Sequence, residues 1–162
     1  MRTQRDVRKD DAEMTISEIA TSFQKYGDIM EFLPPVSLID VAAYEKKNHC
    51  KLPVSYVELL KHFNGGEIFI PGTVIYGIRP RDVFYSVDAA NASDIRNSVS
   101  IPDGYLIIGR LNFGDYICID LSDAGKVIQW DHENDEEFMR WESIEAWLTE
   151  SIEDFQRYNG EV

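Results

Sequence analysis

The chain has 162 residues, 44% of them hydrophobic and 12% aromatic, which suffices for one domain with its own core. Its formal net charge is −13, and the charge is uneven: residues 103–162 carry 4 Lys/Arg against 15 Asp/Glu. Such a field repels nucleic acid and anionic membranes and attracts cationic partners, so the composition argues against a nucleic-acid binder and favours a basic partner.

The start of the sequence gives no sign of a targeting segment. Residues 1–13 are charged and have no apolar core of the kind that a secretory signal carries, so we expect a flexible tail there. No stretch approaches the ~18 apolar residues of a membrane span. Cys50 and Cys118 lack the spacing of paired metal ligands or of a disulfide framework. These features predict a cytoplasmic protein without membrane contact or cofactor.

Residues 14–162 are expected to form one domain that begins with helices. Apolar side chains recur at helical spacing over residues 14–33 and predict an N-terminal helix, which Pro34 and Pro35 cannot continue. A second helix is expected after Ser37, whose hydroxyl is a suitable N-cap.

The stretch LPVSYVELLKHFNGG predicts a third helix and its end. Pro53 suits the first turn, and one apolar stripe is formed by Tyr56, Leu59, Leu60 and Phe63. Asn64-Gly65-Gly66 can adopt positive φ, which ends the helix and reverses the chain into a strand at residues 68–70. Every residue type in this stretch has a packing or turning role, and none requires chemistry.

The second half of the chain reads mainly as an antiparallel meander. A polar helix at residues 87–97 precedes it. Apolar or β-branched runs separated by turn signatures then predict strands at residues 105–108, 116–121 and 126–131, with a short strand at 138–141. A C-terminal helix follows a cap at Ser143 or Glu142. We therefore predict a single α+β domain, with a mostly antiparallel or mixed sheet of about five to six strands, helices packed on one face, and N- and C-terminal helices.

No catalytic motif is recognisable, and we expect the protein not to be an enzyme. The one cluster with metal-binding residue types is His132 together with Asp115, Asp120 and Asp131, which would support a metal-dependent hydrolase. Alternating strand residues face opposite sides, which disfavours such a site. Trp130, Trp141 and Trp147 are expected to pack in or beside the core.

An acidic loop is the strongest candidate for partner binding. Glu133, Asp135, Glu136 and Glu137 fall within five positions after Asp131, at the end of a strand. Exposed carboxylates held there would pair with arginine or lysine on a cationic protein face. A solvated loop without contacts is the alternative, and a surface around Phe69 and Tyr76 is the second candidate.

The order of these elements resembles the SUKH superfamily, in particular its Smi/Knr-type branch. The resemblance covers about residues 37–155. It rests on the following elements: Leu52-Pro53 with Tyr56, Leu60 and Asn64-Gly65-Gly66; Ile108-Gly109 with Gly114-Asp115 and Asp120; Gly125-Lys126-Val127 with Asp131-His132; and Trp147-Leu148 in the last helix. The helix at 14–33 lies outside this shared core and would be an addition specific to a subgroup.

The resemblance implies a one-domain α+β fold and a bacterial immunity protein that neutralises a toxin, often a nuclease, by direct binding. That class has no catalytic residues to carry over. A tryptophan and glycine that are frequent early in the family's strand region correspond here only to Tyr76-Gly77. Two alternatives stay open: a regulatory scaffold of the Smi/Knr type that binds a cellular partner, and the metal-dependent hydrolase.

Overall fold

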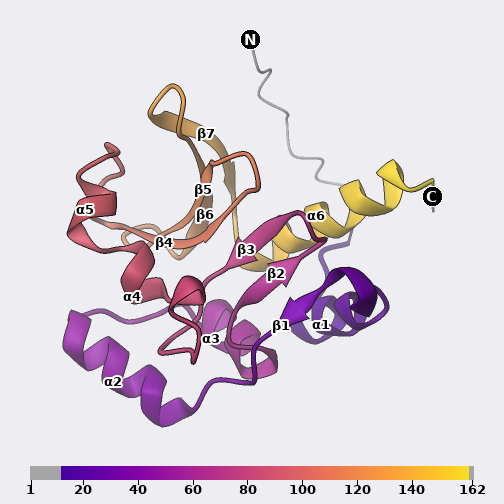
Figure 1. Ribbon diagram of the computed structural model, residues 1–162, viewed down its shortest axis with the longest axis horizontal. Coiled ribbons are helices and arrows are strands. Elements are labelled where there is room, and N and C mark those ends of the chain that lie inside the picture. Colours follow the sequence, from indigo (N-terminus) through magenta and orange to yellow (C-terminus); the bar gives the residue numbers. More distant parts are fainter. Residues whose placement is uncertain (1–11, 161–162) are drawn as a thin grey trace.

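The structure is a computed structural model that describes residues 12–160. Its centre is a seven-stranded sheet in which the strands follow one another in chain order and every neighbouring pair is antiparallel (Figure 1). The strands are β1 Glu31–Phe32, β2 Gly66–Ile68, β3 Thr73–Ile75, β4 Tyr105–Arg110, β5 Tyr116–Asp120, β6 Lys126–Asp131 and β7 Glu136–Trp141.

The helices flank this sheet. They are α1 Ile16–Gln24, α2 Leu38–Asn48, α3 Val54–His62, α4 Val87–Ala90, α5 Ser93–Arg96 and α6 Ile144–Tyr158, with 3-10 turns η1 Gly27–Ile29 and η2 Val83–Tyr85. Helices α1, α3 and α6 contact one another, and α6 also contacts β6 and β7 (Figure 1). The predicted α+β architecture is confirmed, with one or two strands more than expected.

The additional strand content comes from the N-terminal region. The helix predicted over residues 14–33 ends at Gln24, and Glu31–Phe32 instead pairs with β2. The ring of Tyr26 packs against Phe69 and Phe155, at centroid distances of 5.9 and 5.1 Å. This long-range aromatic contact, together with Gly27, outweighs the helical periodicity beyond Gln24.

The predicted corner after α3 exists, but its strand boundaries were wrong. Gly65 and Gly66 have φ of +85° and +143°, and β2 begins at Gly66 rather than at Ile68. A Cβ on Gly66 would lie 1.9 Å from the carbonyl oxygen of Glu31. Glycine at this position therefore allows β1 to approach β2. Phe69, with φ of +54°, takes the chain out of the strand.

Two buried side chains secure the corner to the chain beyond β3. The amide of Asn64 donates to the carbonyl of Ile78 and accepts from its N–H, both at 2.8 Å. The hydroxyl of Tyr56 donates to the carbonyl of Tyr76 at 2.6 Å. These bonds satisfy backbone groups that have no strand partner there, so the stretch at 52–66 acts as a structural brace.

The edge of β4 has two kinds of partner. Strand β3 pairs with its end at Gly109 and Arg110. Farther along, Asn91 bonds both the N–H and the carbonyl of Ile107, at 2.9 and 2.8 Å, and Arg96 donates to the carbonyl of Tyr105 at 2.9 Å. The polar helix predicted at 87–97 is in fact two short helices, α4 and α5, separated by Asn91 and Ala92, and they close this edge.

The predicted core is confirmed. One cluster of buried residues contains all of the side chains expected to pack together: Tyr56, Leu60, Phe63, Ile107, Ile117, Ile119 and Trp147. Trp130 and Trp141 are also buried. Cys118, on the face of β5 opposite Ile117 and Ile119, is buried as well, so side chains on both faces of this strand are covered.

The flexible tail predicted at residues 1–13 lies almost entirely outside the described residues. At the start of the described part, Glu13 accepts a hydrogen bond from Ser143, and the N–H of Met14 donates to Thr149. None of the helices described over residues 12–160 combines the length and apolar character needed to span a bilayer.

Candidate functional site

The β6–β7 hairpin carries the acidic residues singled out in the sequence. We call residues 131–137 the acidic hairpin; its ends are paired through Asp131 and Glu136. In Figure 1 the loop beside β7 projects at the top of the molecule, far from α2. Glu133, Asp135, Glu136 and Glu137 are all exposed. The structure thus brings the predicted carboxylates together on one projecting turn.

Asp131 orders this turn through hydrogen bonds. It is buried, and one of its carboxylate oxygens accepts from the backbone N–H groups of Glu133 and Asn134, at 2.8 and 3.1 Å. The other oxygen accepts from the side-chain amide of Asn134 at 3.0 Å. Asp131 is therefore a positioning residue for the turn rather than part of its outer surface.

Asp135 is held by contacts within the protein. One of its oxygens accepts from the N–H of Ser100 at 2.8 Å and from the indole N–H of Trp130 at 3.1 Å. The hydrogen bonds with Ser100, followed by that with Trp130, lower the pKa of Asp135. Its φ is +54°, a left-handed conformation that aspartate and asparagine tolerate better than most residues.

Glu137 is also engaged. Its two oxygens accept from the Nε and Nη2 of Arg140, at 2.8 and 3.1 Å, and the Tyr105 hydroxyl lies 3.2 Å away. Hydrogen bonding to Glu137 raises the pKa of Arg140. The same guanidinium reaches Asp120 at 3.5 Å. Burial acts to raise the pKa of Asp120, but hydrogen bonds from Ser122 and the charge of Arg140 outweigh burial and lower it.

Two of the four predicted acids remain available. Within residues 12–160, the side chains of Glu133 and Glu136 have no hydrogen-bond or ion-pair partner, and both are exposed. Asp131 and the bond from Asp135 to Trp130 order the turn that carries them. The hairpin thus presents two carboxylates on a fixed support.

Asp135 should contribute to stability through its hydrogen bonds. We expect Asp135→Asn to melt slightly below the wild type at neutral pH, because an amide oxygen still accepts from Ser100 and Trp130 but carries no charge. Asp135→Ala should melt at a lower temperature, because the Trp130 indole loses its acceptor. Thermal melts of the three proteins test this comparison.

Wild type and Asp135→Asn also test how the stability of the fold depends on pH. The pKa of Asp135 is lower in the folded than in the unfolded state, so its ionisation stabilises the fold above the unfolded value of ~3.9. That contribution is lost as the pH falls through the folded pKa. The stability of wild type relative to Asp135→Asn should therefore fall between about pH 5 and pH 3. If the stabilities of the two proteins change in parallel with pH, the ionisation of Asp135 does not stabilise the fold.

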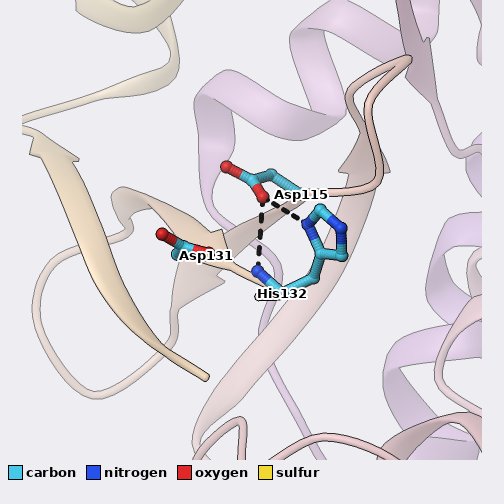
Figure 2. Close-up of side chains that lie close together, drawn as sticks. All are labelled: Asp115, Asp131 and His132. Carbon is cyan, nitrogen blue, oxygen red and sulfur yellow. Dashed lines mark hydrogen bonds and ion pairs between the residues drawn. The ribbon is translucent and has the colours of Figure 1, made fainter. Parts of the chain in front are cut away.

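Asp115 and His132 form a second polar site at the base of the hairpin. Asp115 is fully buried, and one of its oxygens lies 2.6 Å from Nδ1 of His132 and 3.2 Å from the backbone N of His132. Its other oxygen accepts from the Gln129 amide at 2.7 Å. Figure 2 shows one oxygen of Asp115 joined to the backbone N and to the ring Nδ1 of His132, with Asp131 beside this pair.

Three of the four residues that the sequence suggests as metal ligands lie close together. Asp115, Asp131 and His132 each place a ligand-type atom within 4.8 Å of the others, whereas Asp120 is bonded to Ser122 and Arg140 instead. Both oxygens of Asp115 and both oxygens of Asp131 already accept hydrogen bonds. The ring of His132 lies close to Gly114, where a Cβ would be 2.9 Å from Nε2. These contacts account for the cluster as a hydrogen-bonded support of the hairpin.

Phe69 and Tyr76, the second predicted surface, support the fold from within. Tyr76 is buried. The ring of Phe69 stacks on Phe155, with centroids 4.3 Å apart, and contacts Phe23 and Tyr26 edge-on. Neither side chain offers a broad free surface to a partner.

A groove between the sheet and α6 was not predicted from the sequence. It has a volume of about 670 Å³. Its aromatic lining includes Trp141, Trp147 and the exposed rings of Phe113 and Tyr158, and its acidic lining comes from Glu150 and Asp154. A signal was present in the sequence, since Trp147, Glu150, Asp154 and Tyr158 recur at spacings that share one helix face. The sequence does not show that Trp141 and Gln129 lie opposite that face, because this depends on the register of β6 with β7.

Most of the chain matches the model of a known family. The model of the SMI1 / KNR4 family (SUKH-1) matches residues 35–150, which include α2, α3, the whole sheet except β1, and the acidic hairpin. The matched segment leaves out α1, as the sequence suggested for the region before Pro34. No curated protein matches the chain.

Proposed function

Because this chain belongs to the SMI1 / KNR4 family (SUKH-1), we propose that it is a non-catalytic, acidic protein-binding module, an immunity protein that neutralises a basic, nuclease-type toxin by binding it directly. The observation that carries the proposal is the pair of carboxylates, Glu133 and Glu136, that have no partner within residues 12–160 and lie on the ordered acidic hairpin. They lie within residues 103–162, which contain 15 acidic and 4 basic residues.

The electrostatics suit such a partner. A nuclease holds the phosphate backbone with lysine and arginine, so its substrate site is a cationic face. Carboxylates presented on a projecting turn can occupy that face in place of phosphates. Long-range attraction between the two faces would speed association, which is an advantage for a protein that must meet its toxin quickly.

The test is a kinetic comparison with a basic toxin domain encoded beside this chain's gene, used in a catalytically inactive form. We expect the double variant Glu133→Gln/Glu136→Gln to lower the association rate constant several-fold at low salt, with a smaller change in the dissociation rate. The difference should shrink as salt rises, because the Debye length falls from ~10 Å at 0.1 M to ~3 Å at 1 M. Asp135 and Glu137 stay unchanged because they hold the hairpin.

A matched control removes two acids elsewhere. Asp28→Asn/Glu58→Gln changes the net charge equally but lies outside residues 103–162, and it should bind like wild type. If the hairpin variant associates as fast as this control at low salt, the binding surface is elsewhere. If no basic toxin domain binds while a cellular protein does, the regulatory scaffold of the Smi/Knr type replaces the immunity role.

A further inference from the structure

The groove beside α6 has a chemistry distinct from the acidic hairpin. Helix α6 places Trp147, Glu150, Asp154 and Tyr158 along one side, while Ile144, Leu148 and Ile152 on a neighbouring stripe are buried in the core. Across the groove stand Trp141 of β7 and Gln129 of β6. An amphipathic helix here combines a core-facing stripe with a second, aromatic and acidic stripe.

Glu150 is the central charged group. It is half-buried, and its Oε2 accepts from the indole N–H of Trp141, which fixes the carboxylate against the aromatic wall. Its other oxygen has no hydrogen-bond partner among residues 12–160. Asp154, one turn farther along α6, pairs at 3.2 Å with Arg157 in an exposed contact that another cation can replace at little cost.

The aromatic surfaces around these carboxylates favour a particular cation. Trp141 and Trp147 are almost fully buried, whereas Phe113 and Tyr158 are 49% and 88% exposed at the rim. A guanidinium can lie flat on such rings while it pairs with a carboxylate, and its methylene stem adds apolar contact. A strongly hydrated ammonium group fits this arrangement less well.

We propose that the groove binds an arginine-bearing extended segment of a basic protein, with the guanidinium between the rim aromatics and the carboxylates of Glu150 and Asp154. Charge complementarity supports this occupant, because all of the groove's lining residues come from residues 103–162, the strongly acidic part of the chain. The volume of about 670 Å³ exceeds the space of one side chain and accommodates a short peptide. This inference deepens the proposed function and rests on it for the partner's identity.

The three tryptophans provide a direct readout. Trp141 lies across from Val127 and lines the groove, whereas Trp130 points to the opposite face of β6 and donates to Asp135 in the acidic hairpin. We would titrate the ¹⁵N-labelled full chain with N-acetyl tetra-arginine amide at physiological salt and follow the indole N–H signals. The Trp141 and Trp147 signals should shift, and the Trp130 signal should stay in place.

Variants and control peptides make the test specific. Glu150→Gln keeps an acceptor for Trp141 but removes the charge, and it should weaken arginine-peptide binding by about fivefold or more. Glu133→Gln removes the same charge from the acidic hairpin and should change this binding less than about twofold. Tetra-lysine should bind more weakly, and an uncharged tetra-citrulline peptide should not shift the signals.

The outcomes separate the groove from the proposed function. Shifts confined to Trp130 and the hairpin, no shifts at all, or equal effects of tetra-lysine would each overturn the groove inference. If a basic toxin domain binds the chain and Glu150→Gln leaves its affinity unchanged, the groove inference fails and the proposed function stands. If the arginine peptide binds in the groove but no basic toxin domain binds, the groove inference stands and the proposed function fails.

Discussion

Replacing Leu60 by alanine should lower the free energy of unfolding by about 2–5 kcal/mol. Leu60 has no exposed surface, and it belongs to α3, a helix that contacts α1 and α6. Removing three buried carbons leaves a cavity that the close-packed core around it fills only in part. Urea denaturation with an unchanged m value is the appropriate measurement.

Val54→Ala on the same helix is the matched control. Val54 is 77% exposed, so its truncation should change stability by no more than about 0.5 kcal/mol. A loss below about 1 kcal/mol for Leu60→Ala would mean that the interior around α3 is less closely packed than the structure indicates.

Asp115→Ala should also be destabilising, by about 1–3 kcal/mol for each buried polar group that loses its partner. The substitution leaves the Gln129 amide without its buried acceptor and removes both contacts to His132. Asp115→Asn is the control, because its amide oxygen accepts from His132 and the Gln129 amide can rotate to accept from its NH₂ group. We therefore expect chemical denaturation to rank wild type and Asp115→Asn well above Asp115→Ala.

A chelator distinguishes this hydrogen-bonding role from the metal-dependent alternative. If Asp115 acts through Gln129 and His132, the melting temperature of the wild type should be the same with and without EDTA. Stoichiometric metal in elemental analysis, together with a large fall in melting temperature on chelation, would support a hydrolase centred on Asp115, Asp131 and His132 instead.

Much of the fold could be predicted because its signals are local. The meander from β4 to β7 follows period-two apolar runs and turn residues, and Ser143 caps α6 through a hydrogen bond to the N–H of Ala146 at 3.0 Å. The predictions were wrong where contacts between residues distant in sequence determine the local structure. The helix at 14–33 ends early because Tyr26 packs on Phe69, which follows β2, and on Phe155 of α6, which no local pattern reveals.

The sequence predicts which acidic residues lie at the candidate site, but not which of them are free to bind a partner. The sequence identifies four acids on a turn, yet it cannot show that Ser100 and Trp130 bind Asp135 or that Arg140 binds Glu137. These contacts depend on the loop before β4 and on the register of β6 with β7. The groove was missed for the same reason, since its two walls are separated in sequence and meet only when α6 folds back on the sheet.

One edge of β4 is bonded partly by β3 and partly by side chains, and this affects whether other strands can pair with it. Beyond the short β3, the backbone of β4 would offer free donors and acceptors, which are templates for a strand from another molecule. Asn91 and Arg96 satisfy these groups with an amide and a guanidinium, which bond the backbone as a strand would but offer no new edge in turn. These two side chains thus occupy backbone groups with which a strand of another molecule could otherwise pair, which disfavours aggregation along this edge.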